Sequence, residues 1–218
     1  MKPPPWASRY TVGERRADRL IHLAGLALGG IGAVILLSLA IRTTVGIFVA
    51  SLIYATSLAA MLVCSTLYHH HPTLAYRPIL RRLDHAAIFV LIAGTYTPFT
   101  TCRLHGLWAV GMTAAVWAGA LGGGAVKLAG PVRSGGLSTI AYIALGWIGV
   151  IGFRPILDAV DPRALMLLGT GGVIYSFGAC IHRWRSLRFH NSIWHAMVLA
   201  AAACQYAAIV QGVVLAAR

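Results

Sequence analysis

The sequence predicts an all-α integral membrane protein, and three observations support that fold class. Of the 218 residues, 58% are hydrophobic and 11% are charged, whereas a soluble domain has about 45–50% and about 25%. The apolar residues form long continuous runs, not the alternating pattern of membrane β-strands. Short breaks that carry charge, proline or glycine separate these runs. We therefore expect one bundle of seven transmembrane helices.

Each of the seven runs has about the 20 residues that a helix needs to cross a bilayer. A cytoplasmic N-terminal segment, 1–19, is expected to precede the seven-helix domain, 20–218. Because every connection is short, consecutive spans are predicted to be antiparallel, with the chain ends on opposite sides. The predicted spans are 20–41, 46–70, 84–102, 107–128, 136–153, 163–182 and 193–216.

The basic residues predict the orientation of the bundle. The chain has 18 Lys and Arg against 5 Asp and Glu, and on this topology most of the basic residues fall on the N-terminal side. The positive-inside rule then places the N-terminus in the cytoplasm and the C-terminus outside. Since these residues lie between apolar runs, we interpret them as orientation signals and lipid contacts, and we exclude nucleic-acid binding. We expect a multi-pass protein of the inner membrane with lipid as its partner. The basic residues on the opposite side are Arg42, Arg103, Arg154, Arg163 and Arg218.

Polar residues inside apolar spans are costly and often functional. On the predicted topology, Ser65 and His69 lie near the cytoplasmic end of the second span. Asp84 begins the third span and His195 lies near the beginning of the seventh. Ser65 and His69 are four residues apart, as are Asn191 and His195, so each pair shares one helix face. The topology therefore predicts one polar site at the cytoplasmic end.

Histidine is the commonest metal ligand at neutral pH, and zinc accepts imidazoles completed by a carboxylate or a water. From chemistry alone, several interpretations stay open. His69 either binds metal or ends its helix at the interface. Asp84 either caps the third span, belongs to the site, or does both. His195 either binds metal or hydrogen-bonds a carbonyl, and a structural role is expected for the lone His22.

Several motifs, in their order along the chain, resemble those of the haemolysin III family, bacterial relatives of the adiponectin and progestin receptors. Residues 65–69 (STLYH) are similar to the family's second-span S-x-x-x-H. Residues 84–85 (DH), followed by 94–99 (GTYTPF), resemble its third-span signature. Residues 175–178 (YSFG) and 193–196 (IWHA) are similar to segments of its sixth and seventh spans.

The resemblance implies a seven-helix fold with a zinc site near the cytoplasmic face. Its ligands would be the second-span histidine and two seventh-span histidines in H-x-x-x-H. Carried over to this chain, His69 and His195 are the metal ligands. Ser65 and Asp84 are then the catalytic neighbours, with Asp84 orienting a water on the metal.

The chain departs from that pattern at the third ligand. Four residues before His195 stands Asn191, a poor zinc ligand, and His190 lies five residues before it. Five residues turn a helix by about 500°, so His190 points about 140° away from His195. The third-ligand position is therefore Asn191 or His190, and the zinc site is weakened, re-ligated or absent.

Three functions follow as hypotheses. The resemblance suggests a metal-dependent hydrolase of a lipid amide of the ceramide type, with Asp84 as general base. An alternative is a non-enzymatic regulator or sensor of membrane lipid composition or fluidity. A pore-forming cytolysin ranks last, because the spans lack the rows of charged residues expected along a conduction path.

Overall fold

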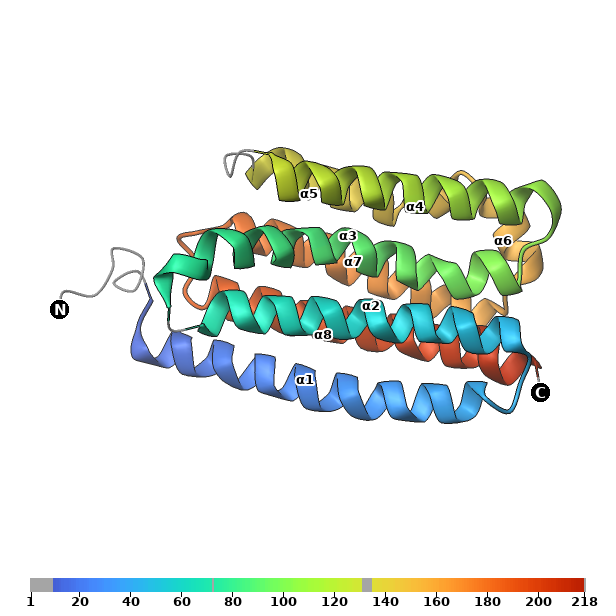
Figure 1. Cartoon of the computed structure of the whole chain (residues 1–218), viewed down its shortest axis with the longest axis horizontal. Coiled ribbons are helices and arrows are strands. Elements are labelled where there is room, and N and C mark those ends of the chain that lie inside the picture. The colour runs from blue at the N-terminus through green and yellow to red at the C-terminus, as the bar shows by residue number, and fades with distance from the viewer. Residues whose placement is uncertain (1–9, 72, 131–134, 218) are drawn as a thin grey trace.

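The computed structural model describes residues 10–71, 73–130 and 135–217, and every regular element in these ranges is a helix. Helix α1 lies along one side of the bundle, and α4 and α5 lie along the opposite side (Figure 1). Helix α1 begins at one end of the bundle, and the last described residues, Leu215–Ala217, lie at the other end (Figure 1). The N-terminal residues 1–9 and the basic residues Arg133 and Arg218 lie outside the described residues. The helices are α1 (Val12–Ala40), α2 (Val45–His70), α3 (Arg77–Cys102), α4 (Gly106–Ala129), α5 (Gly135–Gly146), α6 (Phe153–Ala159), α7 (Pro162–Arg183) and α8 (His190–Ile209).

Helix α1 begins at Val12, well before the apolar run at 20–41 that predicted it. The Thr11 hydroxyl accepts a hydrogen bond from the Glu14 backbone N–H at 3.2 Å, and Glu14 Oε2 accepts one from the Thr11 N–H at 2.7 Å. This reciprocal capping box satisfies backbone donors that a helix N-terminus leaves unpaired. The helix therefore crosses the expected boundary at residue 19 and carries Asp18 in its second turn.

Helix α3 also begins early, at Arg77 instead of residue 84. Pro78 lies in its first turn, where the missing N–H of proline costs no helical hydrogen bond. Tyr76 is the N-cap, so Asp84 lies about two turns inside the helix. The interpretation of Asp84 as a helix cap is therefore wrong.

Within the described ranges, five helices are long and apolar enough to cross a membrane, namely α1, α2, α4, α7 and α8 with its extension to Ala217. The pair α5 and α6 makes a sixth span if its two parts are counted together. Helix α3 is too polar to be counted, but it packs between α2 and α4. Its Thr95 and Thr97 hydroxyls donate to carbonyls one turn earlier, each at 2.8 Å. The chain is a multi-pass membrane protein; seven crossings and the orientation of its ends stay predictions.

The predicted fifth span, 136–153, is interrupted in the structure. Helix α5 ends at Gly146, and α6 continues at 60° to it after a short 3₁₀ turn. The Tyr96 hydroxyl of α3 donates to the Gly146 carbonyl at 2.6 Å and accepts from the Gly149 N–H at 3.0 Å. Backbone groups released by the break thus keep partners inside the bundle. Pro155 lies in the first turn of α6, where the missing N–H of proline costs no helical hydrogen bond.

Helices α2 and α3 are in close contact at Gly94. A Cβ at this position would lie 2.6 Å from the Ser57 Cβ and 3.5 Å from the Ile53 carbonyl oxygen. Neither group can rotate away, because one is a Cβ and the other belongs to the backbone. The missing side chain of Gly94 therefore permits the contact between two of the helices that carry the candidate site.

We expect Gly94→Ala to lower the apparent unfolding temperature of the detergent-purified protein. Overpacking a close contact of this kind costs about 1–3 kcal/mol. The matched control is Gly111→Ala in α4, where an added Cβ meets nothing within 4 Å. Equal unfolding temperatures for the two variants would show that the helices separate at Gly94 without cost.

Candidate functional site

The predicted polar residues meet at the end of the bundle where α1, α3 and α8 begin and α2 ends (Figure 1). Ser65 and His69 occupy the last two turns of α2, and Asn191 and His195 occupy the first two turns of α8. Seven buried polar residues on α1, α2, α3 and α8 lie at this end, none more than 9% exposed: Asp18, His22, Ser65, Asp84, His190, Ser192 and His195.

The carboxylate of Asp18 lies at the centre of this group. Its Oδ1 accepts hydrogen bonds from His195 Nδ1 at 2.7 Å and from Asn191 Nδ2 at 3.2 Å. Its Oδ2 lies 3.8 Å from His69 Nδ1 and 3.7 Å from His70 Nε2. A carboxylate taken out of water needs donors of this kind, because leaving it unpaired costs several kcal/mol. Asp18 therefore ties the beginning of α1 to α2 and α8.

His22 lies one turn after Asp18 on α1 and faces the same group. Its Nδ1 donates to the Asp18 carbonyl at 2.8 Å, and its Nε2 lies 3.4 Å from Ser65 Oγ. Its ring centroid is 5.3 Å from that of His69 and 4.3 Å from that of His195, and the last two are 4.5 Å apart. Each of these three histidines offers a ligand atom within 4.8 Å of the others. They form the histidine triad, with one member from each of α1, α2 and α8.

A second group of potential ligands overlaps the histidine triad and comprises Asp18, His22 and His70. His70 Nε2 is buried, and within the described part of the chain it has no hydrogen-bond partner. A cavity of about 90 Å³ reaches Asp18, His69, His70 and Asn191. We call the two overlapping groups, with Asn191, the polar cluster. The cavity lets water or an ion reach this cluster but leaves little free space.

The remaining predicted residues lie at the margin of the cluster or outside it. Asp84 faces the Ser65 hydroxyl, and its Oδ2 lies 3.7 Å from His85 Nδ1. Ser65 thus stands between Asp84 and the histidine triad. His190 points elsewhere: its Nδ1 donates to the Leu187 carbonyl at 3.1 Å, and its ring stacks 5.8 Å from that of Tyr10.

Sequence reasoning missed the contribution of α1. It placed Asp18 before the first span and expected a structural role for His22, although the two residues are four apart. The available signal was the T-x-x-E pattern of Thr11 and Glu14, which predicts a helix start before the apolar run. With that start, Asp18 and His22 share one helix face.

Glu14 also fixes the beginning of α8. Its Oε1 accepts a hydrogen bond from the Phe189 N–H at 3.0 Å, and its carbonyl accepts one from the Ser192 hydroxyl at 3.3 Å. Phe189 has a φ of 61°, a left-handed conformation that non-glycine residues adopt only when their surroundings hold them there. The hydrogen bonds from α1 therefore support the strained residue that sets the position of Asn191.

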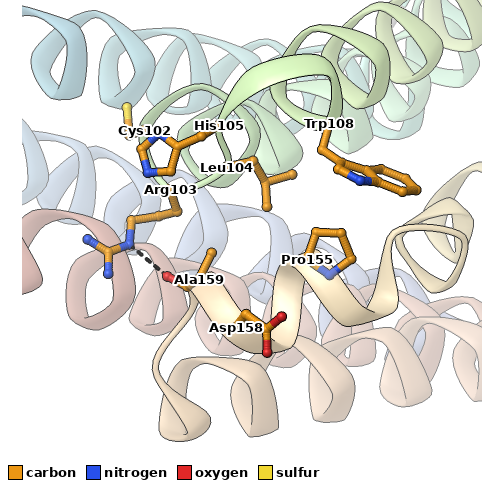
Figure 2. Close-up of a pocket in the computed structure, with 8 residues that line it drawn as sticks. All are labelled: Cys102, Arg103, Leu104, His105, Trp108, Pro155, Asp158 and Ala159. Carbon is orange, nitrogen blue, oxygen red and sulfur yellow. Dashed lines mark hydrogen bonds between the residues drawn. The ribbon is translucent and has the colours of Figure 1, made fainter.

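A larger cavity, about 550 Å³, lies at the other end of α3, between the start of α4 and α6. Figure 2 shows Arg103 at its edge, where Nε donates to the Ala159 carbonyl at 3.1 Å. His105 and Asp158 line it, but neither belongs to a potential metal-binding group among the described residues. Among the described residues, the groups that could hold a metal therefore lie at the opposite end of the bundle.

An all-helical, multi-pass bundle with buried histidines and a carboxylate at one end defines a class of membrane protein with a candidate metal centre. The chain belongs to the haemolysin-III related family, whose model matches residues 15–206. This confirms the resemblance found in the motifs.

Two bacterial relatives cover nearly the whole chain. The Hemolysin-3 homolog of Bacillus subtilis (strain 168) is 33% identical over 198 residues, which cover 90% of this chain and 93% of the relative. Hemolysin-3 of Bacillus cereus is 34% identical over 198 residues, which cover 89% of this chain and 90% of the relative. The human Monocyte to macrophage differentiation factor is 27% identical over 168 residues, covering 72% of this chain and 67% of that protein.

We expect Glu14→Ala to loosen the segment around Phe189, because the variant loses the carboxylate that holds the strained backbone. Faster amide hydrogen exchange over 184–192 is the expected result, with a loss of stability of about 1–2 kcal/mol. The control is Asp161→Ala, which removes the cap that Asp161 Oδ1 provides to the Arg163 N–H at the other end of the bundle. Unchanged exchange over 184–192 in Glu14→Ala would contradict this role.

Proposed function

We propose that this protein is a zinc-dependent hydrolase of a membrane lipid amide, with its site at the cytoplasmic end of seven crossings in the inner membrane. One observation carries the proposal. His69 and His195 come from separate helices, their ring centroids are 4.5 Å apart, and a buried carboxylate oxygen lies 2.7 Å from His195 Nδ1.

The donor set fits zinc. Imidazole nitrogens from converging helices, with an oxygen ligand to complete four-fold coordination, are typical of catalytic zinc sites. A carboxylate that accepts from the Nδ1–H of a histidine leaves Nε2 free to bind metal, and Asp18 does this for His195. The buried Nε2 of His70, which has no hydrogen-bond partner among the described residues, adds a further imidazole 3.7 Å from the same carboxylate.

Zinc, when bound, supplies a Lewis acid that activates water for attack on an amide carbonyl. Asp84 is a buried carboxylate on α3 that no histidine nitrogen approaches closer than 3.7 Å among the described residues. It is free to accept the proton of the attacking water and return it to the leaving amine. Ser65 lies between Asp84 and His22, so its hydroxyl positions the carboxylate relative to the metal ligands.

The distribution of charge supports a cytoplasmic site. Most of the described basic residues lie at the end of the bundle that carries the cluster, and the positive-inside rule assigns that end to the cytoplasm. These residues also suit an anionic lipid surface around the site. They are Arg15, Arg16, Arg19, Arg77, Arg81, Arg82, Lys127, Arg183, Arg185 and Arg188.

We expect the purified protein to contain about one zinc per chain and to release fatty acid from a ceramide-type amide. His69→Ala and His195→Ala should lose both zinc and activity. Asp84→Asn should keep zinc and lower kcat by about 10²–10⁴-fold, because only proton transfer is removed. His182→Ala is the control, since His182 lies at the same end but outside both potential metal-binding groups. Full activity of His69→Ala would sink the proposal.

A second function, a non-enzymatic regulator or sensor of membrane lipid composition, is favoured by one observation. The cavity at the cluster, about 90 Å³, has room for a few waters and not for a lipid amide. In this alternative the only role of the polar cluster, with or without a metal ion, is to stabilise the bundle. Cytolysis, the third function considered from the sequence, stays a prediction.

The two proposals predict different fatty-acid profiles in a strain from which the gene has been deleted. A regulator without catalysis predicts that loss of the gene changes acyl-chain saturation and that Asp84→Asn restores the normal profile as well as the wild-type protein does. A hydrolase predicts that Asp84→Asn fails to restore it. The measurement is the fatty-acid composition of membranes at matched expression levels.

A further inference from the structure

The third zinc ligand implied by the family resemblance is missing from α8, where Asn191 stands four residues before His195. The Asn191 side chain is engaged elsewhere. Its amide nitrogen donates to Asp18 Oδ1 at 3.2 Å and lies 3.5 Å from His69 Nδ1. The nitrogen of this amide donates to Asp18, so position 191 supplies a hydrogen-bond donor to the cluster where the family pattern has an imidazole.

We propose that His22 of α1 supplies the third imidazole of the metal centre, together with His69 and His195. The proposal rests on the function proposed above and concerns which residues of this chain hold the metal. The histidine triad is compact, because one ligand atom from each residue lies within 4.8 Å of the other two. Donor atoms around a tetrahedral zinc lie about 3.3 Å apart, so small side-chain rotations bring the three imidazoles onto one ion.

Hydrogen bonding fixes which nitrogen of His22 is free. Its Nδ1 is 2.8 Å from the Asp18 carbonyl, and a carbonyl only accepts, so this nitrogen carries the proton. The lone pair is therefore on Nε2, which faces the cluster and lies 3.4 Å from Ser65 Oγ. Metal-binding histidines typically hold one ring nitrogen against a carbonyl or a carboxylate in this way.

Asp18 orients two of the three imidazoles. Its backbone carbonyl accepts from His22 Nδ1, and its side-chain Oδ1 accepts from His195 Nδ1. Both rings thus keep Nε2 as the nitrogen that can bind an ion. Asp18 is accordingly a positioning residue, and its carboxylate is engaged by His195 and Asn191.

The overlapping group of Asp18, His22 and His70 is the competing arrangement. It would require Asp18 Oδ2 and His70 Nε2, now 3.7 Å apart, to bind the ion in place of His69 and His195. We favour the histidine triad because its members come from three helices and two of them are already oriented. The two arrangements share His22 and differ in their dependence on His195 and His70.

The test is zinc affinity of the full-length, detergent-purified protein, measured by competition with a chromophoric chelator. His22→Ala should weaken binding by about 100-fold or more, whereas loss of an outer partner costs 10–100-fold. Asp18→Asn should weaken zinc binding by about 10–100-fold. The control His182→Ala should bind zinc like wild type. Adding Asn191→His to His22→Ala should restore at least tenfold, because it returns an imidazole to the turn before His195.

Each outcome decides between the proposals. If His22→Ala binds zinc like wild type while His69→Ala and His195→Ala do not, His22 is not a ligand and the function proposed above stands. If the wild-type protein binds no zinc, both proposals fail. If His70→Ala loses zinc and His195→Ala keeps it, the competing arrangement is correct.

A measurement on the wild-type protein covers the case in which His22→Ala does not fold. X-ray absorption at the zinc edge counts the imidazoles around the bound ion without any substitution. Three imidazoles per zinc is the expected result. Two imidazoles would overturn the assignment of His22, even with one zinc bound per chain.

Discussion

A carboxylate buried at the end of an apolar bundle constrains everything around it. Asp18 is 7% exposed, so water can form few hydrogen bonds to its charge. His195 and Asn191 donate hydrogen bonds to its first oxygen instead, and His69 and His70 lie close to the second oxygen. Because these donors come from α2 and α8, satisfying one carboxylate fixes the approach of the first helix to the second and the last. The polar cluster is therefore part of the packing of the bundle.

The helices were largely predictable, because a bilayer demands long apolar runs whatever else a sequence does. The boundaries were less so. Thr11 and Glu14 start α1 early, and Tyr96 holds a break in the fifth span by bonding to Gly146 and Gly149. A hydropathy pattern contains no information about hydrogen bonds from a tyrosine on another helix. It also does not show that threonine hydroxyls in α3 donate to carbonyls of the same helix.

The α2 and α8 side of the candidate site was also predictable, since Ser65 with His69 and Asn191 with His195 each share a helix face. The α1 side was not, because hydropathy placed Asp18 outside the span and the role of His22 depends on tertiary packing. No local pattern shows that His22 faces Ser65 across the bundle. Position 191 was recognised as unusual, but only the structure shows its amide engaged by Asp18.

Joining the first helix to the last also has a consequence for biogenesis. Membrane helices are synthesised in their order along the chain, and α8, which carries His195, follows α1 only after the helices between them. Until α8 arrives, the carboxylate on α1 lacks its closest partner, the imidazole nitrogen at 2.7 Å. The hydrogen bond that joins α1 to α8 therefore forms only after α8 has been synthesised. The buried carboxylate thus makes the first helix depend on a helix that is synthesised much later.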